Sequence, residues 1–347
     1  MNQTSSYRNP DIVVWEITLK CNLKCLHCGS SAGEIRSDEL TTEEAIDLCR
    51  GLSEIGFKGI ALMGGEVFLR KDWKIIAKEI KDLGISLSII SNGFFKPDKI
   101  IPELARLETD CVMVGMDGSN AEIQDKIRGV KGSFDTAWKF IRAAKNANLV
   151  TGVITTVHKL NFNDLPKIKE LVYKEEVDWQ IQPAGVIGRF PKDLLLTNEE
   201  FYSLGLYIHS LQKKHKKSFT IVGVHNLGFH SSVIPDLSFY PTWNGCYAGK
   251  TVLGIQSNGN IKGCLAMSDK HIEDNIRNRS IVEIWNDPNS FAYNRKFKIE
   301  DLGENCKGCK YGETCKGGCS TRSSTLTGKM HNDPACFYRF EKYVLNK

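Results

Sequence analysis

The cysteines of this chain constrain its fold and chemistry more than any other feature, and three of them share one loop near the start. Cys21, Cys25 and Cys28 have the spacing C-x3-C-x2-C. The loop follows the apolar run IVVWEITL, which predicts a strand of about eight residues. Three thiolates can hold three corners of a 4Fe–4S cube and leave the fourth iron free to bind a reactive group. A structural zinc site is the alternative, but it needs a fourth Cys or His, and His27 is awkwardly placed for that.

Length and charge set the class of protein. The 347 residues exceed what one hydrophobic core usually fills, so we expect one large domain and a smaller one. The apolar fraction of 41% and charged fraction of 25% are typical of a soluble globular protein. A net charge of +5, spread along the chain, does not indicate a nucleic-acid partner. No run could span a bilayer and no secretion signal precedes the first strand, so we expect a cytoplasmic protein without a membrane partner.

The twelve cysteines are clustered, which favours metal binding over disulfides in a chain of this length. Three lie in the first loop and seven lie between residues 246 and 336. The other two stand alone. We interpret Cys49 as a core thiol on a helix and Cys111 as buried packing within a strand.

Strand and helix patterns alternate about six times before residue 228, which predicts parallel strands joined by right-handed crossovers. Periodicity alone does not distinguish an open sheet from a partial barrel. Reactive groups of such folds gather at the carboxyl ends of the strands. The cysteine loop, Gly64-Gly65-Glu66, Ser91-Asn92-Gly93 and Asp117-Gly118 each follow a predicted strand. We therefore expect four strand ends to converge on one mouth.

A cysteine loop of this spacing after a first strand resembles the radical SAM superfamily. The resemblance implies a partial (β/α)6 TIM-like barrel, here over residues 11–228. It also implies a 4Fe–4S cluster whose open iron binds the amino and carboxylate groups of S-adenosylmethionine (SAM). In that family the reduced cluster gives one electron to the sulfonium, and the resulting 5′-deoxyadenosyl radical removes a hydrogen atom from an unactivated C–H bond.

Several positions match the SAM site of that superfamily. Gly64-Gly65-Glu66 resembles its GGE motif, whose glycines let the backbone approach the methionine moiety, although Val67 stands where proline is usual. Ser91 and Asn92 resemble the strand end that contacts the ribose. Gln182, at the end of the sixth strand, is expected to face either SAM or the substrate.

Arg128 resembles an arginine that pairs with the SAM carboxylate in related peptide-modifying enzymes. The alternative for Arg128 is a surface ion pair with Glu122 or Asp125, which lie on the same predicted helix.

The C-terminal cysteines resemble a second family pattern. Cys246, Gly259 and Cys264 fit C-x12-G-x4-C, and a C-x2-C-x5-C-x3-C run and one last cysteine follow. This is similar to the seven-cysteine SPASM domain, which we assign to residues 240–347. The resemblance implies two auxiliary 4Fe–4S clusters. The outer site would comprise Cys306, Cys309, Cys315 and Cys336, and the inner site would comprise Cys246, Cys264 and Cys319. A zinc ribbon is the alternative, but it leaves three of these cysteines unexplained.

Seven thiolates cannot fill the eight positions of two cubes. Some SPASM enzymes supply the eighth cysteine shortly after the first, but here that stretch reads YAGKTVLG. We therefore hypothesise that the inner cluster has a non-cysteine ligand or an open iron that binds substrate.

Most SPASM enzymes modify peptides, so the resemblance implies a maturase of a ribosomally made peptide that forms a cross-link or thioether or oxidises its substrate. The strings HCGSSAG and CKGGC resemble the mycofactocin-type maturases in particular. A sulfatase maturase is an alternative, but Leu265 stands where those enzymes carry an acid. Haem-precursor enzymes, which also use CxHC loops, and a non-enzymatic iron–sulfur electron carrier complete the alternatives. No catalytic base is assigned.

The resemblance also implies partners. We expect a peptide or small-protein substrate and an electron donor such as flavodoxin or ferredoxin. The first strand begins only about a dozen residues from the N-terminus, which leaves no room for a leader-binding domain. A leader peptide would then be bound by a separate protein, the SPASM domain or the barrel surface.

Overall fold

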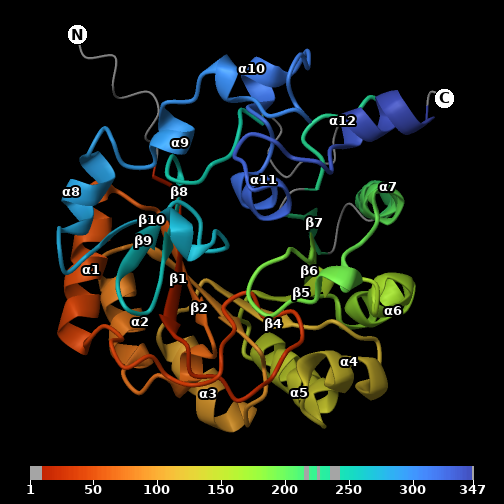
Figure 1. The fold of residues 1–347 in the computed structure, drawn as a ribbon. Coiled ribbons are helices and arrows are strands. Elements are labelled where there is room, and N and C mark those ends of the chain that lie inside the picture. The colour runs from red at the N-terminus through yellow and green to blue at the C-terminus, as the bar shows by residue number, and fades with distance from the viewer. Residues whose placement is uncertain (1–9, 215–218, 225–226, 235–242, 346–347) are drawn as a thin grey trace.

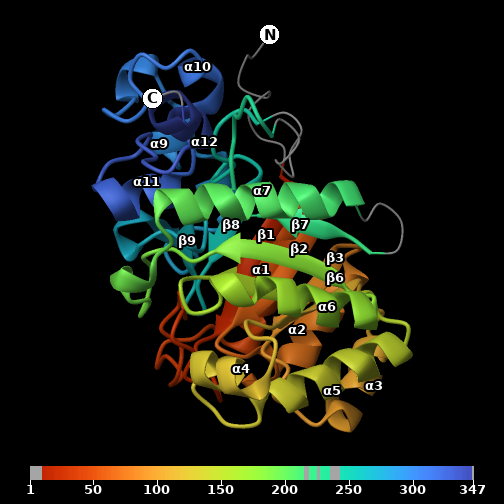
Figure 2. The ribbon, with the colours of Figure 1, turned by 90° about the vertical axis from the view of Figure 1, so that its right-hand side faces the viewer.

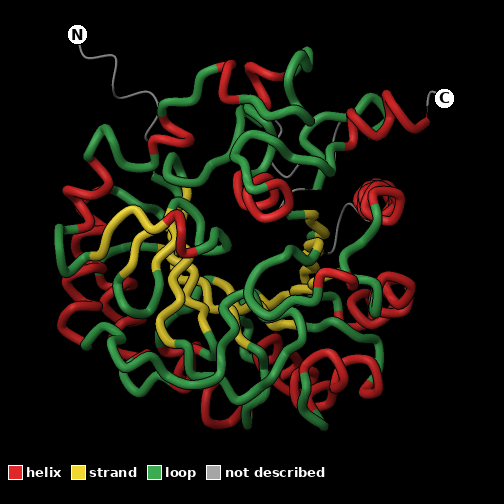
Figure 3. The backbone as a smooth tube through the Cα atoms, in the orientation of Figure 1, coloured by secondary structure: helices red, strands yellow, loops and turns green. Residues whose placement is uncertain are grey.

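The computed structural model describes residues 10–214, 219–224, 227–234 and 243–345. The first residues of the expected second domain, 240–242, lie outside this part of the chain. Figures 1 and 2 show the described chain from two directions, and Figure 3 shows where helices, strands and loops fall along it.

The N-terminal two thirds of the chain form parallel strands that alternate with helices. The strands are β1 (Ile12–Thr18), β2 (Gly59–Gly64), β3 (Ser86–Ser91), β4 (Cys111–Gly115), β5 (Thr151–Val157), β6 (Asp178–Pro183) and β7 (Ile221–Gly223). The helices are α1 (Thr42–Ile55), α2 (Trp73–Asp82), α3 (Pro97–Arg106), α4 (Ala121–Arg128), α5 (Ser133–Asn146), α6 (Leu165–Glu175) and α7 (Asn198–Lys214). Neighbouring strands pair in sequence order, and Figure 1 shows them as an arc with these helices outside it.

Local sequence explains these elements. Helix α1 begins at a capping box, in which Thr41 Oγ1 accepts from Glu44 N (3.2 Å) and Glu44 Oε2 accepts from Thr41 N (2.8 Å). It ends at Gly56, whose φ of 92° favours glycine. Along each strand, one set of side chains is fully buried against the helices, as Trp15 of β1 is.

The two solitary cysteines behave differently. Cys49 is fully buried on α1, which confirms its assignment as a core thiol. Cys111 is only half-buried, so the prediction of buried packing is wrong. It lies on the face of β4 opposite the buried Val112 and Val114, because side chains of a strand alternate between its two faces.

The C-terminal segment combines short elements with long loops. It contains β8 (Val252–Ile255), β9 (Asn260–Lys262), β10 (Ile272–Asn275), α8 (Ile281–Asn286), α9 (Ala292–Arg295), α10 (Gly312–Cys315), α11 (Ser320–Thr327) and α12 (Phe337–Phe340). Strand β8 pairs in parallel with β1, so that the three short strands extend the barrel sheet to ten strands, ordered β10-β9-β8-β1-β2-β3-β4-β5-β6-β7.

Aromatic packing attaches the end of the chain to the barrel helices. Tyr202 of α7 lies with its ring 5.3 Å from that of Phe337 and 5.0 Å from that of Phe340. Figure 2 shows α7 running beneath α11 and α12. In the described part of the chain, every helix is too short or too polar to cross a membrane.

Candidate active site

The first cysteine loop is fixed by backbone hydrogen bonds to the end of α4. Lys24 N donates to Arg128 O (3.1 Å) and Leu26 N donates to Ile127 O (2.9 Å). Two sulfurs accept main-chain hydrogen bonds, Cys21 from Leu23 N (3.4 Å) and Cys28 from Ala32 N (3.2 Å). Such bonds stabilise thiolates, which are the form that binds iron.

Burial raises the pKa of the Cys21 thiol to about 11 and also raises that of Cys25. Without a bound metal, burial therefore keeps these two thiols protonated at neutral pH, and iron binding would have to displace the protons. Nowhere in the described chain do three His, Cys, Asp or Glu side chains converge as a single metal ion requires. The cysteines of a 4Fe–4S cube each bind a different iron and therefore stand further apart.

Gly64 and Gly65 are required by a close backbone crossing at the end of β2. A Cβ on Gly64, whose φ is 146°, would lie 2.3 Å from Thr18 O, and one on Gly65 would lie 2.2 Å from Lys20 O. Gly65 N also donates to Thr18 O (2.7 Å). The contact that explains these glycines is therefore with the chain entering the cysteine loop. Their contact with SAM stays a prediction.

Glu66 is a buried carboxylate that holds the end of β3. It accepts from Ser91 Oγ (3.0 and 3.1 Å), from Asn92 N (2.8 Å) and from Phe68 N (3.4 Å). Asn92 Nδ2 in turn donates to Asn22 Oδ1 (2.7 Å), in the cysteine loop. Ser91 and Asn92, expected to contact ribose, thus lie beside the loop with their side chains engaged in protein hydrogen bonds.

Replacement of Glu66 by glutamine is expected to change how stability depends on pH. Burial raises the pKa of Glu66 to about 7, although hydrogen bonds from Asn92 and Ser91 oppose the shift. The folded protein therefore binds this proton more tightly than the unfolded chain. That contribution is complete below the ordinary pKa of 4.5 and is lost as the pH rises towards 7, by roughly 3 kcal/mol at most.

Thermal unfolding of the parent and Glu66→Gln proteins between pH 4.5 and 7 measures this effect. The stability advantage of the parent should shrink as the pH rises. Glu43→Gln, on the exposed face of α1, is the control and should follow the parent at every pH. Parallel curves for the parent and Glu66→Gln would contradict the assignment.

A buried ionic cluster lies beside Cys25. Asp117, fully buried after β4, lies 2.6 Å from Arg128 Nη2 and 3.4 Å from His27 Nε2 through the same oxygen, Oδ2. Its other oxygen accepts from Thr156 N (2.8 Å). Arg128 Nη1 lies 3.9 Å from Cys25 Sγ. The alternative of a surface ion pair with Glu122 or Asp125 is wrong, because Arg128 is buried and its partner is Asp117.

Charges in this cluster support one another. Burial opposes ionisation of Asp117, but the charge of Arg128, helped by the hydrogen bond from Thr156 N, outweighs it and holds the pKa of Asp117 below its usual range. Burial also opposes the charge on Arg128, whose pKa is nevertheless raised by Asp117 and Cys25. Burial lowers the pKa of His27 to about 4, so the imidazole is neutral at pH 7. Asp117 and Arg128 therefore form a charged pair next to the cysteine loop.

Some polar atoms of this cluster have no protein partner within the described residues. They are Arg128 Nε, His27 Nδ1 and His158 Nε2, each buried. The rings of His27 and His158 are 5.9 Å apart. Buried donors and acceptors without partners are uncommon, and they mark places where a ligand completes the hydrogen bonding.

His158 and Asn161 were not predicted from the sequence as site residues. Asn161 Nδ2 donates to Asp117 O and Thr156 O, at 3.0 Å each, and thereby ties the ends of β4 and β5 together. The segment HKLN after β5 was the available signal, since polar residues follow a strand end there. Gln182 lies on β6 and donates from Nε2 to Thr156 Oγ1 (3.0 Å).

The three inner cysteines come together. Cys246 and Cys319 are in hydrogen-bonding contact, and this contact holds the pKa of Cys246 below its usual range. Cys264 interacts electrostatically with Cys246 and accepts a hydrogen bond from Thr321. The half-buried Tyr293 has its Oη 3.3 Å from Met267 Sδ. Desolvation raises the pKa of this phenol, and the charges of the nearby Cys246 and Cys264 add to the shift.

The outer cysteines lie on tight turns around a buried carboxylate. Cys306 N donates to Gly303 O (2.8 Å) and Cys309 N donates to Cys306 O (3.1 Å). Asp333 Oδ2 accepts from Cys319 N (3.4 Å), and its charge adds to burial in raising the pKa of Cys306 to about 12 and that of Cys336 to about 11. Asp333 therefore lies between the inner and outer cysteine sites.

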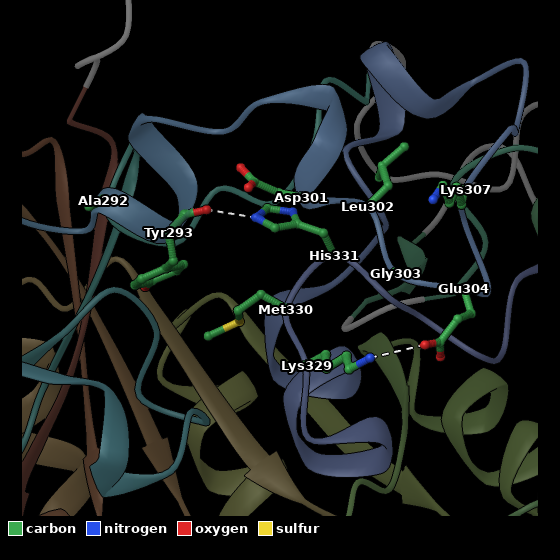
Figure 4. A pocket seen from close by; sticks show the side chains of 10 residues that line it. All are labelled: Ala292, Tyr293, Asp301, Leu302, Gly303, Glu304, Lys307, Lys329, Met330 and His331. Atoms are coloured by element: carbon green, nitrogen blue, oxygen red, sulfur yellow. Dashed lines mark hydrogen bonds and ion pairs between the residues drawn. The ribbon is translucent and has the colours of Figure 1, made fainter.

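A hollow of about 680 Å³ lies beside the segment that carries Cys306. Figure 4 shows the side chains that line it. His331 lies in its wall, with Nε2 2.6 Å from Tyr293 O and Nδ1 2.6 Å from Lys316 O. This imidazole joins α9 to the turn that carries Cys315. Lys329 and Glu304 form an ion pair of 3.0 Å across the same wall.

Comparisons with known proteins agree with this arrangement. Residues 15–172 match the model of the radical SAM superfamily, and residues 246–310 match that of the SPASM iron–sulfur cluster-binding domain. The Fe-coproporphyrin III synthase of Methanosarcina barkeri is 28% identical over 363 residues, covering 98% of this chain and 90% of the relative. The mycofactocin maturase MftC of Mycolicibacterium smegmatis is 27% identical over 337 residues, covering 94% and 82%.

Solved structures show the same fold. SuiB of Streptococcus suis superposes with a TM-score of 0.75 at 16% identity and covers 95% of this chain and 76% of its own. The structure titled native anSMEcpe with bound AdoMet has a TM-score of 0.72 at 18% identity and covers 97% of both chains. The predicted α/β partial barrel followed by a cysteine-rich SPASM domain is thus confirmed. The comparisons also support the predicted cofactors, 4Fe–4S clusters and SAM.

Proposed function

This chain is a radical SAM enzyme with a SPASM domain, and from this premise we propose that it abstracts a hydrogen atom from a carbon of a peptide substrate. The observation that carries the proposal is the cysteine loop beside the buried Asp117–Arg128 pair. A reduced cluster held by Cys21, Cys25 and Cys28 would supply the electron that cleaves the sulfonium of SAM, and the 5′-deoxyadenosyl radical so formed would take the hydrogen atom.

We assign the residues around the SAM cluster as follows. Cys21, Cys25 and Cys28 hold three irons. Arg128, whose Nε lacks a protein partner in the described structure, binds the SAM carboxylate, and Asp117 positions its guanidinium. The strand ends that carry Gly64, Gly65, Glu66, Ser91, Asn92 and Gln182 complete the pocket. In the same proposal, the radical SAM barrel spans residues 11–228 and the SPASM domain spans residues 240–347.

The SPASM cysteines take two auxiliary clusters in this proposal. Cys306, Cys309, Cys315 and Cys336 hold the outer one, and Cys246, Cys264 and Cys319 hold the inner one. The inner site then has a position for a non-cysteine ligand or for substrate. A Mössbauer spectrum should reveal one iron of the inner cluster that differs from the other three; four cysteine-like irons would contradict this assignment.

A peptide substrate is supported by the likeness to MftC and by the local strings HCGSSAG and CKGGC. Leu265 disfavours formylglycine formation, since an acid is expected there in sulfatase maturases. A haem precursor is the second candidate. A specific observation favours this candidate: the AdoMet-dependent heme synthase of Methanosarcina barkeri is 28% identical, and the match covers 95% of this chain and 97% of that protein.

The test begins with the anaerobically reconstituted full chain. Dithionite and SAM should yield 5′-deoxyadenosine, and a protein without this product would not be a SAM-cleaving enzyme. The same preparation is then incubated in parallel with a short peptide encoded beside this gene and with an iron-coproporphyrin-type macrocycle. A mass shift of the peptide alone supports the maturase proposal, and a shift of the macrocycle alone overturns it.

A further inference from the structure

We propose that the segment after β6, residues 184–194, is a positioning element for the proposed SAM cluster, because it fixes Cys28 and the hydrogen bond that this sulfur accepts. We call residues 184–194 the strap. The proposal rests on the proposed function, since Cys28 must hold iron for the strap to act on a cluster. The sequence gave no reason to place any residue of the strap in the site.

The strap is fixed at both ends to the end of β5. At its start, Ala184 N donates to Val157 O (2.8 Å). Near its end, Lys159 N donates to Leu194 O (3.0 Å). Between these points Phe190 is buried and anchors the strap in the protein. The path of the strap is therefore determined by β5, independently of the cysteine loop that it crosses.

The middle of the strap lies against the backbone of the cysteine loop. Arg189 N donates to Cys28 O (3.2 Å), which also accepts from Ser31 N (3.2 Å). A Cβ on Gly188, whose φ is 58°, would lie 2.2 Å from Cys28 O and 2.4 Å from Gly29 O. Position 188 therefore requires glycine, because any side chain would push the strap and the cysteine loop apart.

The strap also holds the residue that donates to the Cys28 sulfur. Ala32 is buried, and its N donates to Cys28 Sγ (3.2 Å). The guanidinium of Arg189 donates from Nη2 to Ala32 O. Ala32 thus bonds to the sulfur with its donor and to the strap with its acceptor. Loss of the strap contacts would free Ala32 and weaken the N–H···S bond.

This bond matters because hydrogen bonds to the sulfurs and exposure to solvent both set the reduction potential of an iron–sulfur cluster. An N–H donor stabilises the more negative, reduced state and therefore raises the potential. Solvent is close, since Cys28 is half-buried and Gly29 is exposed. A strap that holds Ala32 against Cys28 would thus raise the potential of the cluster and limit the access of water and oxygen to it.

The test measures the midpoint potential of the SAM-sensitive cluster by electron paramagnetic resonance in the anaerobically reconstituted full chain. The part of the signal that changes when SAM is added identifies this cluster. Gly188→Ala is compared with Gly84→Ala. Gly84 also has a positive φ, 75°, but an added Cβ there would meet no heavy atom of the described residues within 4 Å. At a fixed potential, we expect Gly188→Ala to lower the reduced-to-oxidised ratio by at least about 3-fold and Gly84→Ala to change it by less than about 1.5-fold.

Arg189→Met provides the same test without a steric clash. It removes the bond from the guanidinium to Ala32 O, and the exposed position of Arg189 lets the variant fold as the parent does. The potential should fall as in Gly188→Ala, and the iron–sulfur absorbance should be lost in air at least about 2-fold faster than in the parent. Arg106→Met, at an exposed arginine of α3, is the control and should match the parent in both measurements.

Iron content and thermal unfolding show whether Gly188→Ala is assembled, and if it is not, Arg189→Met decides. Parental potentials in the assembled variants, with a SAM-sensitive signal still present, would overturn the role of the strap alone. An equal shift in Gly84→Ala or Arg106→Met would also overturn it, because the effect would then not depend on contact with residues 28–32. Absence of any SAM-sensitive signal in the parent would overturn the proposed function and this proposal with it.

Discussion

Alanine in place of Cys25 is expected to lower 5′-deoxyadenosine formation by about 1000-fold or more and to remove about four iron atoms per chain, those of one cluster. The reason is that the proposed cluster has only three protein ligands, so no other thiolate of the loop can replace the lost one. Iron analysis and product quantification after anaerobic reconstitution measure both effects.

Cys111→Ala is the matched control for this prediction. Cys111 is half-buried on β4 and belongs to none of the three proposed cysteine sites. Its replacement should leave both iron content and product formation within about 2-fold of the parent. Retention of all iron by Cys25→Ala, or an equal loss of iron in Cys111→Ala, would refute the assignment of Cys25 as a cluster ligand and of Cys111 as a cysteine outside the three sites.

Asparagine in place of Asp117 is expected to weaken SAM binding by about 10- to 100-fold and to destabilise the fold by about 3 kcal/mol. The carboxylate lies 2.6 Å from Arg128 Nη2, and without it the buried guanidinium beside Cys25 loses its carboxylate counter-charge. Equilibrium binding of SAM and thermal unfolding measure the two effects separately.

Asp164→Asn serves as the control for Asp117→Asn. Asp164 is also buried, but it accepts from Ser119 N and Ser119 Oγ, at 2.7 Å each, rather than from Arg128. Its replacement should cost stability without the loss of SAM affinity. Arg128→Gln should weaken SAM binding as Asp117→Asn does but destabilise the fold less. Unchanged SAM affinity in both Asp117→Asn and Arg128→Gln would show that Asp117 and Arg128 take no part in SAM binding.

Short-range features of the fold were predictable from the sequence. The capping box of Thr41 and Glu44, the order of strands and helices, and the burial of Cys49 follow from neighbouring residues. The hairpin of β8 and β9 also had a signal, because Asn258-Gly259 is a typical turn pair shortly after the apolar run VLGI, and Gly259 has a φ of 85°. Gly259 is also the glycine of the C-x12-G-x4-C pattern, so the same residue fits both a turn and the cysteine spacing.

Long-range contacts were not predictable in the same way. The pairing of Asp117 with Arg128 and His27 joins a strand end, a helix end and the cysteine loop. On the helix alone, Glu122 and Asp125 were nearer in sequence and therefore seemed the natural partners of Arg128. Only the crossover that places α4 against the loop decides which carboxylate the guanidinium meets. The same holds for Cys111, whose strand was predicted but whose position on the face of β4 away from the helices was not.

The parallel pairing of β8 with β1 has a consequence for any attempt to divide the protein. Ile12 to Trp15 are hydrogen-bonded on one side to β2 and on the other to Val252 to Ile255. A barrel fragment lacking β8 would expose a free row of backbone donors and acceptors along an apolar strand. Such edges recruit other strands, so the fragment should self-associate rather than behave as an independent unit. Strand β8 of the cysteine-rich segment therefore also covers the edge of the barrel sheet and protects it from pairing with other chains.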